Sequence, residues 1–183
     1  AFLMIGGSNR KKDGALYKEG KDFIYSINPA TKEIFGKAVL ASRGELEEAI
    51  DCAFDAKKKW ASVDVSRRCE IVDRIGDKIE NRKDYFASMI IREMGKNWRE
   101  ANADVDEAID FCHFYANQMR KLGSEDTSLN QFVLGEENRT KYIPRGVTSV
   151  IAPFNFWAIL VGMTTAALVA GNSVIVKPSP NAP

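Results

Sequence analysis

The sequence contains few of the residues that build metal centres or disulfide frameworks, with 3 cysteines and 1 histidine in 183 residues. Cys52, Cys69 and Cys112 each fall within a helical pattern, and none of them has metal-ligand spacing. We therefore expect no metal site and three buried free thiols in a reducing compartment. His113 has no suitably spaced catalytic partner in the sequence, which favours a structural role over a catalytic one.

The chain also lacks a dominant sign of charge and an apolar run of membrane length. Its 26 basic and 25 acidic residues leave a formal net charge of +1, so nucleic acid is not an expected partner. The apolar stretch 154–176 is interrupted by Asn155 and by Gly171-Asn172-Ser173. The helix between these breaks is shorter than the about 20 residues of a membrane span. A composition of 45% hydrophobic and 28% charged residues fits one ordinary globular core.

The last part of the chain, residues 145–183, has the pattern of a βαβ unit. A strand is predicted over Gly146–Ala152, an apolar helix over Ala158–Ala170 and a second strand over Ser173–Lys177. Parallel strands of this kind are buried on both faces by further strands and helices, and none follow in this sequence. We therefore expect the front portion of a nucleotide-binding α/β enzyme, with apolar surface and strand edges left open.

Residues 1–122 are predicted to form a β-hairpin followed by a layer of helices. Phe23–Ile27 and Ile34–Val39 have the composition of strands and are joined by an Asn-Pro turn. Ser42 and Glu45 form a capping box at the start of the first helix.

Three more helices are expected, the first capped by Ser66, the next running from about Arg82 to Gly95, and the last beginning at about Trp98. The apolar residues of all four helices recur at helical spacing and are expected to face the core. These residues include Leu46, Ile50, Ala53 and Phe54 of the helix that Ser42 begins, and Val105, Ile109, Cys112, Tyr115 and Met119 of the last helix.

Between these two parts, residues 123–144 are predicted to form a projecting hairpin arm. Gln131–Leu134 and Thr140–Ile143 have strand character and flank a polar tip. A hairpin that projects from a domain presents unpaired edges, so we expect it to pair with another chain.

Two polar residues flank the expected carboxyl edge of the sheet, where α/β folds bind ligands. Asn155 lies between the first strand and the helix, where its amide can either stabilise an oxyanion on a carbonyl or cap the helix. Lys177 ends the second strand, where its ammonium can either reach a ribose or remain solvated. The aromatic residues Phe156 and Trp157 are favoured as core, with substrate contact as the alternative.

Several segments resemble the aldehyde dehydrogenase superfamily, and the resemblance extends over essentially the whole chain. The motifs at the end of the chain are Tyr142–Val147, Val150–Phe156, Gly162–Ala167, Gly171-Asn172 and Val176–Pro178. The upstream segments Asn28–Thr31, Glu93–Lys96 and Asp104–Cys112 are similar to those of the 1-pyrroline-5-carboxylate dehydrogenase branch, which also occurs within bifunctional proline-utilisation proteins.

The resemblance implies an incomplete, N-terminal part of a Rossmann-type cofactor domain. It also implies NAD-dependent oxidation of glutamate γ-semialdehyde to glutamate, by a homo-oligomer assembled through the 123–144 hairpin. The expected location is cytoplasmic, or the mitochondrial matrix in a eukaryote. By position, Asn155 matches the family's oxyanion-stabilising residue. The substrate-binding matches are Phe156 and Glu107, and the cofactor-binding matches are Ile151, Ala152, Pro153, Phe154, Lys177 and Ser179.

Three departures from the family pattern are evident. Trp157 replaces a proline that fixes the turn after the first strand, and Pro180 replaces a residue that helps to hold the ribose, so weaker NAD binding is expected. The family's nucleophilic cysteine and general-base glutamate have no counterpart in these 183 residues, so this chain alone is expected to be inactive.

Two alternatives to this reading stay open. One is a related semialdehyde dehydrogenase, and the other is a non-catalytic interaction module that retains the fold.

Overall fold

The computed structural model describes residues 3–5, 8–10, 23–123, 133–136, 138 and 141–183. Its centre is a parallel pair of strands, β5 (Val147–Ile151) and β6 (Ser173–Lys177), connected by helix α5 (Trp157–Val169). The pairing runs in register from Val147 opposite Ser173 to Ile151 opposite Lys177. The predicted βαβ unit is thus confirmed, with the helix displaced by one residue.

Asn172 and Gly171 close this unit at its amino-terminal edge. The side chain of Asn172 accepts from the Gly146 N–H at 2.9 Å and donates to the Ala167 carbonyl at 3.1 Å. Gly171 has φ of 92°, a left-handed value that favours glycine, and it carries the chain from the end of α5 into β6. The sequence signal Gly171-Asn172 therefore ends the helix, as expected.

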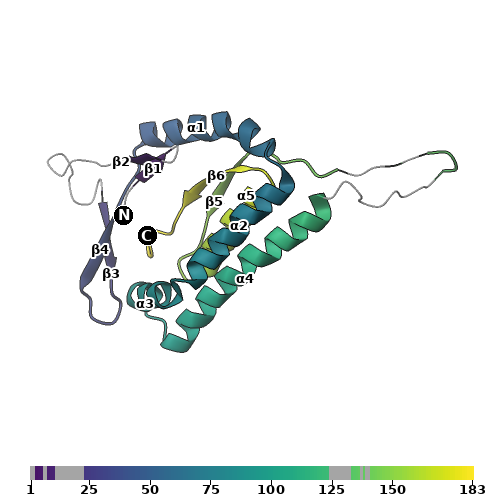
Figure 1. Cartoon of the computed structure of the whole chain (residues 1–183). Coiled ribbons are helices and arrows are strands. Elements are labelled where there is room, and N and C mark those ends of the chain that lie inside the picture. Colours follow the sequence, from purple (N-terminus) through teal and green to yellow (C-terminus); the bar gives the residue numbers. More distant parts are fainter. Residues whose placement is uncertain (1–2, 6–7, 11–22, 124–132, 137, 139–140) are drawn as a thin grey trace.

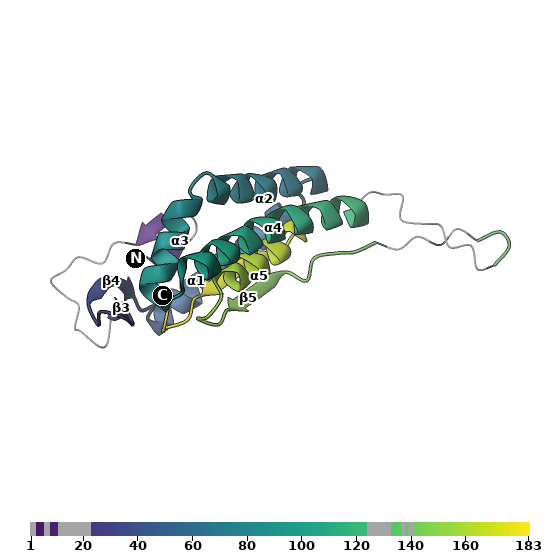
Figure 2. The ribbon, with the colours of Figure 1, turned by 90° about the horizontal axis from the view of Figure 1, so that it is seen from below.

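The helices form layers against this βαβ unit (Figure 1). Helix α1 (Arg43–Ala61) contacts both strands, while α4 (Trp98–Gly123) and α2 (Val65–Glu80) pack on α5. Figure 2 shows α2, α4, α5 and β5 in succession from this side. Helix α3 (Lys83–Met94) packs on α4 and lies beside the antiparallel hairpin of β3 (Phe23–Ile27) and β4 (Ile34–Val39). A second, small hairpin, β1 (Leu3–Ile5) with β2 (Ser8–Arg10), was not expected from the sequence.

The core lies between α2, α3, α4 and α5. Its fully buried members include Cys69 and Val72 of α2 and Val105 and Cys112 of α4. Ile109 is also buried, and Tyr115 and Met119 pack against the cluster while partly buried. The inward face predicted for α4 is therefore confirmed.

Two expectations for the first two helices are wrong. The capping box of Ser42 and Glu45 is present, but Leu46 and Phe54 of α1 are exposed rather than buried. Helix α1 packs mainly on the narrow strand pair, and the Lys57 ammonium lies over the exposed Phe54 ring, 3.9 Å from its centroid. Helix α2 is capped by Asp64 and not by Ser66, because the Asp64 carboxylate accepts from the backbone N–H groups of Ser66 and Arg67.

The predicted arm lies partly outside the described residues. Residues 133–136 form a turn closed by a bond from the Glu136 N–H to the Val133 carbonyl at 3.1 Å, and residues 141–145 are irregular. The strands predicted over Gln131–Leu134 and Thr140–Ile143 are absent from their described parts. Val133 is 56% exposed and Leu134 is 98% exposed, so the described tip buries little apolar surface that would fix a strand register.

No helix in the described part of the chain combines the length and the apolar character required to cross a membrane.

Candidate functional site

The turn between β5 and α5 presents Asn155 to solvent. Ala152 is buried, whereas Pro153, Phe154, Asn155 and Phe156 are exposed. Phe156 holds the N-cap position in an extended conformation and provides no side-chain hydrogen bond. The side chain of Asn155 makes no hydrogen bond to another described residue, so the helix-capping alternative for Asn155 is not observed. Its amide is free to donate to a ligand.

The cap of α5 comes from α4. Asp104 is 1% exposed, and its Oδ1 accepts from the Ala158 N–H at 2.8 Å while Oδ2 accepts from the Trp157 N–H at 3.3 Å. Free N–H groups and the helix dipole both favour a negative charge at this end. Sequence reasoning missed this role, although an aspartate on the apolar face that includes Ala101, Val105 and Ala108 was the available signal.

Lys96 completes the arrangement at the start of α5. Its Nζ lies 2.6 Å from Asp104 Oδ2 and 3.8 Å from the centroid of the Phe156 ring. Lys96 follows Gly95, which ends α3 with φ of 69° and leaves only 2.9 Å between a hypothetical Cβ and Pro29. The hairpin loop at Pro29 therefore helps to fix the path of the chain at Lys96.

The opposite end of α5 faces a buried cation. Arg68 is 5% exposed, and its guanidinium donates to the Val169 carbonyl at 3.0 Å and to the Ala61 and Val63 carbonyls. Trp60 Nε1 donates to the Leu168 carbonyl at 2.8 Å. Helix α5 is thus held by an anion at its amino end and a cation at its carboxyl end, which complements its dipole.

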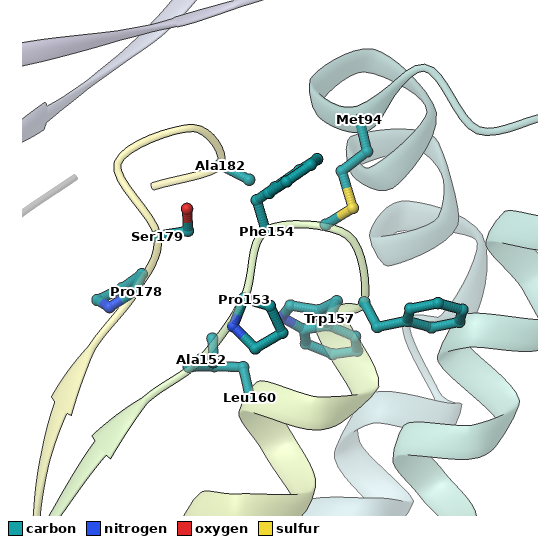
Figure 3. Close-up of a pocket in the computed structure, with 10 residues that line it drawn as sticks. Met94, Ala152, Pro153, Phe154, Trp157, Leu160, Pro178, Ser179 and Ala182 are labelled. Atoms are coloured by element: carbon teal, nitrogen blue, oxygen red, sulfur yellow. The ribbon is translucent and has the colours of Figure 1, made fainter.

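The expected cofactor residues lie at the carboxyl edge of the strand pair. Lys177 and its register partner Ile151 are both exposed, and Ser179 is buried with its Oγ accepting from the Asn181 N–H at 3.2 Å. Figure 3 shows Ser179 and Phe154 on two sides of a small pocket. The pocket, of about 20 Å³, is large enough for about one water molecule and is lined by Met94, Ala152, Pro153, Phe154, Phe156, Trp157, Leu160, Pro178, Ser179 and Ala182.

The departure at Trp157 is accommodated by the core. Its indole stacks on Phe86 with 4.8 Å between ring centroids and an interplanar angle of 20°. Its backbone N–H donates to Asp104, so the residue begins α5 without the fixed φ of a proline. Phe156 is 41% exposed and lines the pocket, so the expectation that it belongs to the core is wrong. The other expected substrate residue, Glu107, is exposed on α4 outside the lining.

Other candidate groups lie away from this edge. His113 Nδ1 is 3.1 Å from Asp73 Oδ1, so the histidine does have a carboxylate partner, contrary to the sequence-based expectation. Asp73 also pairs with Arg120. Burial raises the pKa of the Cys69 thiol, and it raises the pKa of Cys112 to about 11. The three cysteines are free, but Cys52 is only partly buried, contrary to the expectation of three buried thiols. In the described residues no acidic, histidine or cysteine cluster could hold a metal ion.

Comparison with known proteins defines the class. The profile of the aldehyde dehydrogenase family matches residues 17–183, and the chain belongs to this family. The α/β fold also matches the N-terminal portion of solved aldehyde dehydrogenases, which include a benzaldehyde dehydrogenase from Corynebacterium glutamicum at 23% identity and a TM-score of 0.80, covering 100% of this chain and 37% of that one.

Within the family, the chain is similar to proteins named 1-pyrroline-5-carboxylate dehydrogenase and proline utilization A. The chain is 43% identical to a 1-pyrroline-5-carboxylate dehydrogenase of Anoxybacillus flavithermus, over 99% of this chain and 34% of that protein. A Thermus 1-pyrroline-5-carboxylate dehydrogenase with bound NAD matches with 33% identity and a TM-score of 0.88, over 99% of this chain and 34% of that one. Proline utilization A of Bdellovibrio bacteriovorus matches with 35% identity and a TM-score of 0.89, over 99% of this chain and 18% of that one. The chain therefore spans about a third of the length of the curated relatives.

Proposed function

We propose that this chain is the N-terminal part of an NAD-dependent aldehyde dehydrogenase that oxidises glutamate γ-semialdehyde to glutamate in proline degradation. The observation that carries the proposal is the uncommitted amide of Asn155, exposed at the carboxyl edge of a parallel strand pair. The 43% identity to a protein named 1-pyrroline-5-carboxylate dehydrogenase supports the substrate class.

Asn155 would act on the carbonyl oxygen of the aldehyde. When a nucleophile adds to the carbonyl carbon, the electron pair of the C=O bond moves to oxygen, and the Asn155 Nδ2–H group donates to the charge that develops there. Because the backbone N–H groups of Trp157 and Ala158 are engaged by Asp104, they do not compete for this oxygen.

The covalent step needs an activated thiolate, which we assign to another part of the full protein. Cys69 and Cys112 are buried in the helical core, and burial raises the pKa of both thiols, so neither is suited to attack at pH 7. Cys52 lies on α1, outside the residues that line the pocket.

NAD would bind at the exposed edge formed by Ile151, Ala152, Pro153 and Phe154, and when bound it accepts the hydride from the substrate carbon. The residues present fit a ribose, since the Lys177 ammonium is exposed at the end of β6 and the Ser179 hydroxyl keeps its own proton to donate. The start of α5 is already occupied by the Asp104 carboxylate, so we do not place the pyrophosphate there. Pro180 offers no side-chain acceptor, which favours weak NAD affinity.

For the substrate, we propose that Phe156 packs on the aliphatic part and that Glu107 faces the charged end. The Phe156 ring lines the pocket, and Glu107 lies one helical turn beyond Asp104 on α4. We further propose cytoplasmic location and a homo-oligomer that uses the 123–144 arm. The exposed apolar residues Leu134, Tyr142 and Ile143 support this use of the arm. The division of the chain into a helical part (1–122), an arm (123–144) and a βαβ unit (145–183) is also part of the proposal.

The test is NADH formation by the full-length product of the gene that encodes this chain. Glutamate γ-semialdehyde is compared with succinate semialdehyde and benzaldehyde at equal concentrations. The proposal predicts the highest kcat/KM for glutamate γ-semialdehyde. A higher value for succinate semialdehyde would assign the protein to a related semialdehyde dehydrogenase, and no NADH with any aldehyde would favour a non-catalytic module.

A further inference from the structure

Asp104 is a buried carboxylate with no part in the proposed covalent chemistry. Both of its oxygens are engaged, by two backbone N–H groups of α5 and by the Lys96 ammonium. A buried carboxylate is costly unless its hydrogen-bond donors are held in good geometry around it. The three groups that donate to Asp104 are therefore held in fixed positions relative to it. What it contacts is the residue pair that directly follows the turn with Asn155 and Phe156.

We infer that Asp104 and Lys96 are positioning residues for that turn. Asp104 keeps the Asn155 amide available to donate a hydrogen bond to a ligand, and Lys96 orients the Phe156 ring. The catalytic consequence rests on the proposed function, whereas the positioning itself does not. Nothing in the turn performs this task, because the N-cap residue Phe156 has no capping side chain.

The argument for Asn155 concerns competition for the helix N–H groups. Asparagine is among the preferred capping residues, and Asn155 is the polar side chain nearest in sequence to the start of α5. Because the Asp104 carboxylate satisfies the Trp157 and Ala158 N–H groups, the Asn155 amide is not drawn back onto them. Replacement of Asp104 by asparagine leaves one acceptor oxygen where there were two, so one of those donors becomes a competing partner for Asn155.

The argument for Lys96 concerns the ring of Phe156. The Lys96 Nζ is held by Asp104 at 2.6 Å and lies 3.8 Å from the ring centroid, within cation–π range. Only 15% of the Lys96 side chain is exposed, so solvent screens this contact weakly. The ammonium therefore couples the acid that fixes α5 to the aromatic residue that faces the pocket.

The first test compares Asp104→Asn with Arg68→Gln in the full-length gene product. Both variants remove a buried charge from an end of α5, but only Asp104 is next to the turn. For Asp104→Asn we expect kcat to fall by roughly 10- to 100-fold with the KM for NAD unchanged, because misplacement of a catalytic group by about 1 Å costs about that much. Arg68→Gln should lower the thermal midpoint while kcat stays within about threefold of wild type. Equal kcat losses in the two variants, or none in Asp104→Asn, would overturn the inference.

Hydrogen exchange of the segment 155–160 decides the positioning without any assay of activity. Exchange in this segment should accelerate at least about tenfold in Asp104→Asn and remain at the wild-type rate in Arg68→Gln, whose effect should appear near residues 167–171. Unchanged exchange in Asp104→Asn would refute the inference. If wild-type protein oxidises no aldehyde, the proposed function fails and this measurement alone decides the positioning role.

Lys96 provides a second pair of variants if Asp104→Asn does not fold. Lys96→Met keeps the length and packing of the side chain but removes the cation, whereas Lys96→Arg retains it. We expect Lys96→Met to raise the KM for the aldehyde about fivefold to tenfold, with Lys96→Arg restoring it to within about twofold of wild type. An unchanged KM in Lys96→Met would contradict the coupling to Phe156.

Discussion

The carboxylate of Asp104 accepts a hydrogen bond from the backbone N–H of Ala158 at 2.8 Å, so that an acid of α4 closes the first turn of α5. This bond links the helical layer to the strand pair at the edge where the exposed turn 153–156 lies. At the other end of the same helix, the Arg68 guanidinium donates to the Val169 carbonyl. The start of α5, and with it the turn, therefore depends on Asp104, a residue far away in the sequence.

The close packing of α4 on α5 predicts that Gly162→Ala destabilises the chain. A Cβ at Gly162 would lie 2.8 Å from the Phe111 ring, which itself stacks on Tyr115 at 5.6 Å and cannot easily retreat. The clash should outweigh the better helix propensity of alanine, giving a net loss of about 1–2 kcal/mol in the free energy of unfolding measured by denaturant titration. The matched control is Gly44→Ala in α1, where nothing lies within 4 Å, and a small stabilisation is expected. Stabilisation by both substitutions would show that α4 and α5 are not in this contact.

Burial of the Cys112 thiol predicts a loss of stability in alkaline solution. Its pKa rises from an ordinary value of 9.0 to about 11 in the folded chain, because burial disfavours the thiolate. The neutral thiol therefore stabilises the fold fully below pH 9, and this contribution is lost as the pH rises through about 11, amounting to roughly 2–3 kcal/mol.

The measurement is the free energy of unfolding of wild type and Cys112→Ala between pH 8 and pH 11. Other groups titrate in both proteins, so the difference between the two curves isolates the thiol. The difference should shrink with rising pH, and two parallel curves would contradict the assignment.

The 183-residue chain by itself is predicted to self-associate and to bind NAD weakly or not at all. Apolar side chains lie open along the strand pair and the turn, including Ile151 at 64% exposure, Phe154 and Val176. An exposed patch of this kind favours association. Light scattering and calorimetric titration with NAD measure the two properties. A stable monomer with micromolar NAD affinity would be incompatible with this prediction.

Much of the fold could be predicted from local sequence signals. The strands Phe23–Ile27, Ile34–Val39 and Ser173–Lys177 have the predicted bounds, because each is delimited by turn residues. The capping box at Ser42 and the glycine stop at Gly95 are equally local signals, and both are present. Local chemistry within a few residues was sufficient for these elements.

Only part of the candidate site could be predicted from the sequence, because the contacts that support the site join residues far apart in the chain. The turn with Asn155 follows from the strand-to-helix pattern, but its cap comes from Asp104 and the cation at the other end of α5 from Arg68. Spacing along the sequence does not reveal which helix end a buried charge will meet. The same holds for the exposed Leu46 and Phe54, whose burial depends on how much of α1 the strand pair covers.

The most direct test of the account is the kcat of Asn155→Ala in the full-length gene product, with glutamate γ-semialdehyde and NAD both saturating. Loss of one oxyanion donor should lower kcat by about 10²- to 10³-fold while the KM for NAD stays unchanged, because the amide acts on the charge that develops in the transition state. Wild-type turnover by the Ala variant would show that Asn155 is not the oxyanion donor.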